Sequence, residues 1–251
     1  IKMFAPMIFS FALYMMLLLY GQSISKSVST EKTSKLMETL LTSIHPYALI
    51  TGKVLATTAM AMLQFVSWII AAVIGLYGGN AVAKAIYPEY ESSVVTIINF
   101  LKDNIGENAL SLPAVILTIL IFCVGFLFYC VLAGLAGSMV SKPEEASNTQ
   151  ALFQFPIIIS WLFSYITPVT GNEGTLNILR FIPFTIPFSL PADLLTGVVG
   201  LGQGLLSLVI LLIFSLLVIM LSARLYKGLV LYTGQKLNIK TIGNIIRAKS
   251  D

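Results

Sequence analysis

Charged residues are scarce in this chain, and their scarcity excludes an ordinary soluble domain. Lysine, arginine, aspartate and glutamate together make up 10% of the 251 residues, whereas hydrophobic residues make up 57%. Soluble globular proteins carry about a quarter charged residues. The composition therefore indicates an integral membrane protein, and we expect an all-α fold.

Histidine and cysteine are also rare, which leaves little material for catalysis. The chain has one histidine, His45, and two cysteines, Cys123 and Cys130, which lie seven positions apart in one apolar run. On one helix that spacing is too wide for a disulfide, so we interpret both as buried thiols. The motifs H-E-x-x-H, G-x-S-x-G and the phosphate-binding loop G-x-x-x-x-G-K-[ST] are missing. We therefore predict no catalytic residue, no metal site and no ATP hydrolysis by this chain.

Long hydrophobic runs are what the sequence has in abundance. A helix that crosses a bilayer needs about 20 mainly apolar residues, and five runs reach that length: 3–24, 50–78, 111–140, 150–168 and 203–225. A sixth apolar stretch, residues 181–202, is interrupted by Pro183, Pro187, Pro191, Gly197 and Gly200. Because proline removes backbone donors and favours turns, we predict a pair of short re-entrant or interfacial pieces there.

The positions of lysine and arginine predict which side each loop faces. With five spans, the segments 25–49, 141–149 and 226–251 share one side, and all of the 15 basic residues except Lys2, Lys84, Lys102 and Arg180 lie there or at the adjoining span ends. Basic residues concentrate on the cytoplasmic side. We therefore expect a multi-pass protein of the plasma membrane with a cytoplasmic C-terminal tail and an outer loop at 79–110. Residue 1 then lies outside with no signal peptide before it, so we expect an upstream span.

The charged segment between the first two runs predicts an amphipathic helix. If Thr30 caps this helix, Glu31 lies in its first turn, where the helix dipole favours an acid. One face is then apolar (Leu36, Met37, Leu40, Leu41 and Ile44), the residues pointing away from it are polar (Lys32, Lys35, Glu38 and Thr39), and His45–Pro46 ends the helix. Two interpretations stay open: a helix that floats on lipid headgroups or a docking surface for a cytoplasmic partner. The mixed charge signs favour the second, because a lipid-binding helix is mostly basic.

Residues 31–53, EKTSKLMETLLTSIHPYALITGK, carry a family resemblance. This stretch resembles the cytoplasmic segment of ABC type-2 permeases, the membrane subunits of ATP-binding-cassette exporters, and is most similar to the branch that includes sodium-extrusion permeases. The matching positions are Glu31, Lys32, Leu36, Glu38, Leu40, Leu41, Ser43, Pro46, Gly52 and Lys53. The large outer domain that the family has between its first two spans is not within residues 1–251, which agrees with the expectation that an N-terminal part precedes residue 1.

The resemblance implies a partner for the charged segment. Residues 29–45, including Lys35, would form a coupling helix that docks in a groove of a separate cytoplasmic ATPase subunit, and that subunit would bind ATP and Mg²⁺. A second permease chain would complete the translocation path. We expect no binding to nucleic acid. The rival interpretation is a passive channel or a membrane-embedded enzyme that has no ATPase partner.

Several weaker signals accompany this prediction. Glu144 and Glu145, in the polar turn 141–148, either start an ordinary helix or make a second contact to the ATPase. Polar residues within spans (Gln154, Ser160 and Gln64) either line a substrate path or make hydrogen bonds between helices. Arg180 and Asp193 either guard an outer gate or are solvated ends. Small residues four positions apart predict close helix packing within the subunit or, as the alternative, a dimer seam; these pairs are Gly75/Gly79, Ala133/Gly137, Gly134/Ser138 and Gly200/Gly204.

Overall fold

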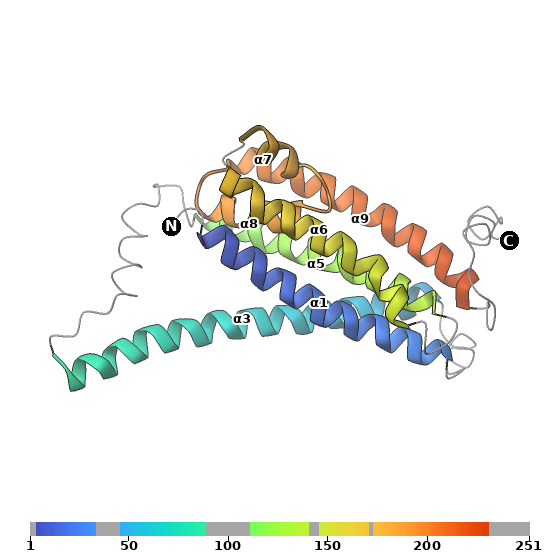
Figure 1. Cartoon of the computed structure of the whole chain (residues 1–251), viewed down its shortest axis with the longest axis horizontal. Helices are drawn as coiled ribbons and strands as arrows, with labels where there is room; N and C mark the ends of the chain where they lie inside the picture. Colours follow the sequence, from blue (N-terminus) through green and yellow to red (C-terminus); the bar gives the residue numbers. More distant parts are fainter. Residues whose placement is uncertain (1–3, 34–45, 89–110, 141–145, 171–172, 231–251) are drawn as a thin grey trace.

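Helices account for nearly all of the structure. The computed structural model describes residues 4–33, 46–88, 111–140, 146–170 and 173–230 (Figure 1). Within these ranges the chain forms seven helices and no strand: α1 (Phe4–Thr33), α3 (Pro46–Ile86), α5 (Leu112–Ser138), α6 (Ala146–Thr170), α7 (Glu173–Leu179), α8 (Ile186–Leu195) and α9 (Leu201–Val230). All except α7 and α8 are long and apolar enough to cross a membrane. The predicted all-α membrane fold with five spans is confirmed.

Helix α5 lies at the centre of the bundle, because small residues let its neighbours approach closely. It packs against α1, α3, α6, α8 and α9 (Figure 1). A Cβ atom added at Gly137 would lie 2.4 Å from the backbone oxygen of Ser25 in α1, and one added at Gly125 would lie 2.4 Å from Cγ of Pro187 in α8. The predicted packing of small residues within the subunit is therefore confirmed where Gly137 meets α1.

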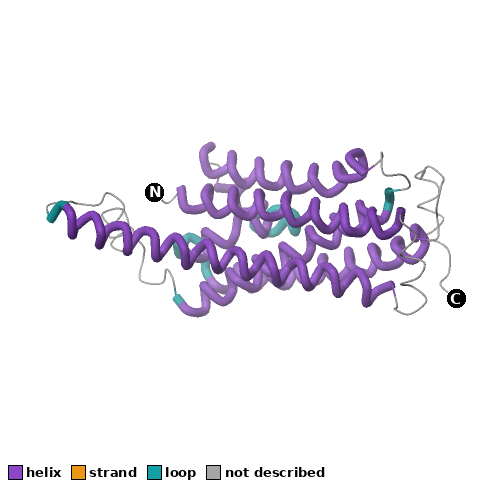
Figure 2. The backbone as a smooth tube through the Cα atoms, turned by 90° about the horizontal axis from the view of Figure 1, so that it is seen from below, coloured by secondary structure: helices purple, strands orange, loops and turns teal. Residues whose placement is uncertain are grey.

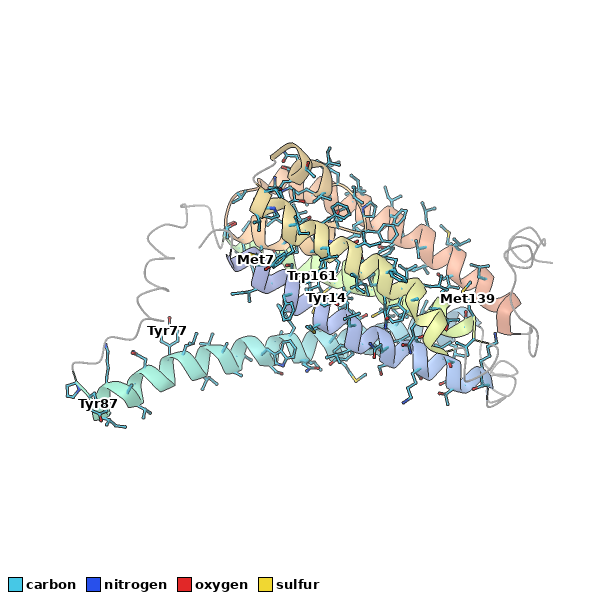
Figure 3. All side chains as sticks on the ribbon, viewed as in Figure 1. Met7, Tyr14, Tyr77, Tyr87, Met139 and Trp161 are labelled. Carbon is cyan, nitrogen blue, oxygen red and sulfur yellow. The ribbon has the colours of Figure 1, made fainter. Side chains whose placement is uncertain are left out.

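Aromatic pairs join the helices that surround α5. Phe65 of α3 stacks on Phe122 of α5, with ring centroids 4.7 Å apart. Tyr14 of α1 stacks on Trp161 of α6 at 4.5 Å, and Figure 3 shows these two side chains next to each other. Such pairs contribute about 0.5–1.5 kcal/mol beyond the apolar area that they bury. They therefore help to fix the order of the helices around the core.

Helix α1 is longer than the sequence predicts. The first span was expected to end at residue 24, but the helix continues without interruption to Thr33. Its polar continuation has a buried face at helical spacing, made by Ile24, Ser25, Val28, Ser29 and Lys32. This face packs against α5, and the tertiary contact holds a polar sequence in the helix. The predicted segment 25–49 thus begins inside α1.

Helix α3 leaves the bundle in its second half. Its apolar part, Thr51–Ile86, is about 54 Å long at 1.5 Å per residue, whereas the hydrocarbon core of a bilayer is about 30 Å thick. Val54 and Ala61 are buried in the first half, but the half that ends near Tyr77 and Tyr87 diverges from the other helices (Figures 1, 2 and 3). The predicted outer loop 79–110 therefore starts in a helix, and its residues 89–110 lie outside the described part.

The glycines of this diverging half do not pack as predicted. A Cβ atom added at Gly75 or Gly79 would meet no atom within 4 Å in the described residues. The prediction that this pair packs within the subunit is wrong. The physical reason is that the half of α3 that contains Gly75 and Gly79 has separated from α1 and α5.

The proline-rich stretch folds into the bundle and does not lie on its surface. Helix α8 packs mainly against α5 and α1, and eight of its ten residues are buried. Pro187 lies in its first turn, where no backbone donor is needed. Gly197, with φ of 71°, reverses the chain just after the helix. Helix α8 is therefore part of the packed core, and whether the stretch 181–202 is re-entrant or interfacial stays a prediction.

Candidate functional site

The predicted coupling residues are only partly within the described ranges. We call the end of the bundle where α1 finishes at Thr33, α5 finishes at Ser138 and α3 begins at Pro46 the linker end (Figure 1). Glu31, Lys32 and Pro46 lie there. The other predicted coupling residues lie outside the described ranges: Lys35, Leu36, Glu38, Leu40, Leu41, Glu144 and Glu145.

The predicted helix start at Thr30 is wrong. Thr30 and Glu31 lie in the last turns of α1, which is continuous from Phe4 to Thr33. A polar residue before an acid is a typical cap pattern, but here the preceding turns already have a buried face against α5 and stay helical. Pro46 is the first residue of α3, a position that proline favours because its missing N–H is not needed there.

An ion pair at the linker end joins α1 to α3. The carboxylate of Glu31 contacts the ammonium group of Lys53, which also donates a hydrogen bond to the hydroxyl of Ser27 at 3.0 Å. Both charged side chains are about one-fifth exposed. The pair connects the two helices that the linker 34–45 joins, so it fixes the distance between the ends of that linker.

Lys32 joins α1 to α5 at the same end. Its side chain is buried, with 4% of its surface exposed, and its Nζ donates a hydrogen bond of 2.6 Å to the backbone oxygen of Ser138. Ser138 is the last residue of α5, where the helix dipole attracts a cation. Lys32 was expected among polar residues that point outward, but it is buried toward α5, because it follows Val28 by four residues on the buried face of α1; Lys35 and Glu38 lie outside the described residues.

Two of the three polar residues predicted to line a path make hydrogen bonds between helices. Gln64 of α3 accepts a hydrogen bond from the hydroxyl of Tyr20 in α1. Ser160 of α6 lies 3.2 Å from the hydroxyl of Tyr129 in α5, which also donates to the backbone oxygen of Phe184 at 2.7 Å. Gln154 is half-buried on α6. Gln64 thus joins α3 to α1, whereas Ser160 joins α6 to α5.

Arg180 and Asp193, the predicted outer-gate residues, contact each other. Nη2 and Nε of Arg180 donate to Oδ2 of Asp193 at 2.7 and 3.0 Å, and Nη1 donates to Asn177 at 2.8 Å. The side chains are only 6% and 13% exposed, so the alternative that they are solvated ends is wrong. Ser207 of α9 donates to the backbone oxygen of Arg180 at 2.8 Å. The pair therefore joins the segment before α8 to α8 itself and to α9.

A groove of about 630 Å³ opens between α6 and the segment 175–185. Most of its lining is apolar, and its residues are Phe155, Pro156, Ile159, Ser160, Phe163, Thr175, Ile178, Leu179, Ile182, Phe184 and Thr185. We call this surface the α6–α7 groove. Ser160 is the one predicted path residue that lines it; Gln154 and Gln64 do not.

Comparison with known proteins identifies the family. The model of the ABC-2 family transporter proteins matches residues 2–224, which include every described helix apart from the last residues of α9. The chain belongs to the ABC-2 transporter family. It is therefore a membrane transport component, as the resemblance of residues 31–53 implied.

Two curated relatives match nearly the whole of this chain. The chain is 28% identical over 244 residues to the uncharacterized protein YhaP of Bacillus subtilis, a match that covers 94% of this chain and 54% of the relative. It is 27% identical over 244 residues to the uncharacterized protein MJ1024 of Methanocaldococcus jannaschii, covering 97% of this chain and 54% of the relative. The chain thus spans about half the length of these relatives. No solved structure matches the chain.

Sequence reasoning missed two features of this ABC-2 chain. The first is the partner of Lys32, because the backbone oxygen of Ser138 is 106 positions away along the chain. The second is Tyr129, whose hydroxyl joins α5 to α6 and to the backbone before α8. A tyrosine inside an otherwise apolar span was the available signal, since a buried phenol usually finds a hydrogen-bond partner.

Proposed function

We propose that this chain is the permease subunit of an ABC exporter and that a separate ATPase subunit drives it from the linker end. Membership of the ABC-2 family supports a transport component with an ABC ATPase partner. The C-terminal tail would then be cytoplasmic, in agreement with the basic residues at 226–251. The ATP and Mg²⁺ would be bound by the partner.

The observation that carries this proposal is the pair of connections around the linker 34–45. Glu31 and Lys53 join α1 to α3, and Lys32 joins α1 to α5. A force on the linker would therefore reach three spans at once. Residues 29–33 of the proposed coupling segment 29–45 are the last turns of α1, so a separate coupling helix would lie within 34–45. Glu144 and Glu145, in the sequence between α5 and α6, would make a second contact that acts on both helices.

The transport cycle would use two arrangements of these spans. ATP favours one arrangement only if the ATPase subunits bind it more tightly in that state, and the linker would convey that preference to the permease. A second permease chain would complete the translocation path. Within it, Gln154, Ser160 and Gln64 are proposed path residues, and the Arg180–Asp193 pair is the proposed outer gate.

Purification from native membranes tests this function. The tagged full chain should co-purify with a protein that carries a phosphate-binding loop and hydrolyses ATP. Replacing Leu40 and Leu41 together with aspartate should remove that protein and its ATPase activity while leaving the permease in the membrane. The exposed Lys26 offers a matched control, since Lys26→Glu changes charge at the same end without touching the ion pair.

The rival function is a passive channel or a membrane-embedded enzyme. A channel would keep its flux in vesicles that contain no nucleotide, whereas the proposed exporter would lose it. An enzyme would need acid and base groups within the spans, which the sequence does not supply. Flux that is independent of ATP in purified vesicles would therefore decide for the channel.

A further inference from the structure

Helix α5 contacts both the linker end and the helix that carries Asp193. At the linker end, the backbone oxygen of Ser138 accepts the hydrogen bond from the buried Lys32. Near the other end of α5, the hydroxyl of Thr118 donates a hydrogen bond of 3.3 Å to the backbone oxygen of Pro191 in α8. Asp193 of the proposed outer gate lies two residues further along α8. One helix therefore connects the proposed docking region with the proposed gate.

The part of α5 between these contacts is suited to transmit a displacement. A proline inside a helix removes a backbone hydrogen bond and allows a kink. Helix α6 has Pro156 and Pro168 inside it, whereas the proline of α5, Pro113, lies in its first turn. The stretch from Thr118 to Ser138 is about 30 Å of uninterrupted helix at 1.5 Å per residue. A shift at the linker end therefore moves the whole of this stretch.

Tyr129 joins the middle of α5 to the turn before α8. Its side chain is 1% exposed, and its hydroxyl donates a hydrogen bond of 2.7 Å to the backbone oxygen of Phe184. The amides of Phe188 and Ser189 in the first turn of α8 bond to the oxygen of Thr185 instead. Tyr129 thus supplies the donor that this turn of α8 does not give to Phe184. Because loss of a donor to a buried oxygen is unfavourable, Phe184 follows Tyr129 when α5 moves.

The turn passes a displacement of Phe184 to Arg180. The hydroxyl of Thr185 donates a hydrogen bond to the backbone oxygen of Leu179, which closes the chain around residues 180–184. Arg180 lies inside this closed turn and pairs with Asp193 of α8. Helix α5 therefore contacts both sides of the ion pair: Tyr129 acts on the turn of Arg180, and Thr118 acts on the helix of Asp193.

We infer that Tyr129 is a positioning residue for the Arg180–Asp193 pair and that its hydroxyl passes a displacement of α5 at the linker end to this pair. Without the hydroxyl, α5 would act on α8 alone, and the turn of Arg180 would no longer follow. The inference deepens the proposed function and rests on it for the source of the displacement, which would be the ATPase. The connection itself belongs to this chain and can be tested without that partner.

Hydrogen exchange of the purified full chain in lipid nanodiscs tests the connection. Lys32→Met perturbs α5 at the linker end, and mass spectrometry follows the amides of residues 180–185. The readout is their exchange rate divided by that of residues 55–65 in α3, because a loss of global stability raises both rates. We expect Lys32→Met to raise this ratio about threefold, within the range of couplings between distant sites. Lys26→Met, on the exposed face of α1, should leave it unchanged.

Tyr129→Phe removes the hydroxyl and keeps the ring. In this variant Lys32→Met should no longer change the ratio. Tyr20→Phe is the matched control, because it also removes a buried-side hydroxyl that joins two helices, here α1 and α3 through Gln64. The response to Lys32→Met should persist in Tyr20→Phe. A merely structural role of Tyr129 would raise the exchange rates in Tyr129→Phe but leave the response to Lys32→Met in place, and that result would overturn the inference.

The wild-type background and a second variant decide the case in which Tyr129→Phe does not fold. An unchanged ratio in Lys32→Met would show that the displacement does not reach the turn. Thr118→Val releases α8 from α5 and keeps Tyr129, so the response of residues 180–185 should remain. Its loss in Thr118→Val would assign the transmission to α8 and overturn the role of Tyr129. These measurements use neither nucleotide nor transport, so a missing ATPase contradicts the proposed function alone, and a missing response contradicts this inference alone.

Discussion

The carboxylate of Glu31 and the ammonium group of Lys53 form an ion pair between the last turns of α1 and the second turn of α3. These residues stand at the two ends of the sequence motif that resembles the ABC type-2 coupling segment. The pair therefore holds together the end of α1 and the start of α3, the two helices that residues 34–45 connect in the sequence. An exchange of charges between the two positions provides a direct test of this pair.

Glu31→Lys should place two cations beside each other and weaken both folding and ATPase docking. The double variant Glu31→Lys, Lys53→Glu restores opposite charges and should recover most of the loss. Because the pair is about one-fifth exposed, we expect a coupling free energy of only about 0.2–1 kcal/mol. Thermal unfolding of all four proteins gives this energy as a double-mutant cycle. Additive effects of the two single changes would show that the pair does not act as a unit.

Lys32→Met should destabilise the protein more than loss of the Glu31–Lys53 ion pair. The substitution leaves the buried backbone oxygen of Ser138 without the charged donor that now lies 2.6 Å from it. A hydrogen bond to a charged group contributes about 1.5–3 kcal/mol, so a loss of that size is expected in unfolding experiments. Lys26→Met, on the exposed face of the same helix, should change stability little. Equal effects of the two substitutions would remove Lys32 from the connection between α1 and α5.

Arg180→Met or Asp193→Asn should each be strongly destabilising. Either change leaves an unpaired buried group, and breaking a buried ion pair from one side costs about 3–5 kcal/mol. Replacing both residues with apolar side chains should cost less than the Arg180→Met change alone. This order can be read from the melting temperatures of the three variants. If the double variant is stable but leaks substrate, the pair acts as the proposed outer gate; a tight double variant limits it to a structural role.

Gly137→Ala and Gly75→Ala should have opposite effects. A methyl group at Gly137 would push on the backbone of Ser25, and overpacking of this kind costs about 1–3 kcal/mol. A Cβ atom at Gly75 would meet no atom of another described helix within 4 Å, so alanine there should gain up to about 1 kcal/mol of helix propensity. Thermal unfolding of the detergent-solubilised chain distinguishes the two. Destabilisation by Gly75→Ala would show that this part of α3 is packed against something.

The sequence was sufficient for the span count but not for the helix ends. Hydrophobic length alone located α5 and α9, because these helices are apolar along nearly their whole length. It failed for α1, where the first span was expected to end at residue 24 and a separate helix to start at Thr30, whereas one helix continues to Thr33. Only the contact of residues 25–32 with α5 keeps that part helical, and a contact between distant residues is not visible in local composition.

For the candidate site as well, the sequence indicated some residues but not their contacts. Arg180 and Asp193 could be singled out because charges are rare in this chain, yet their pairing depends on how the proline-rich segment between them folds. Lys32 was placed on the wrong face because a new helix was expected to start at Thr30. Once α1 is known to continue, simple helical spacing from Ile24 and Val28 places Lys32 on the buried face.

The central claim is that a separate ATPase drives this chain through the linker end. Affinity purification of the full chain from native membranes, with mass spectrometry and an ATPase assay of the purified fraction, tests it most directly. The account predicts a co-purifying protein with a phosphate-binding loop and ATPase activity, both lost in the Leu40→Asp, Leu41→Asp variant and kept in Lys26→Glu. An ATPase subunit that stays bound in the double aspartate variant, or a purified chain that transports without any such subunit, would contradict it.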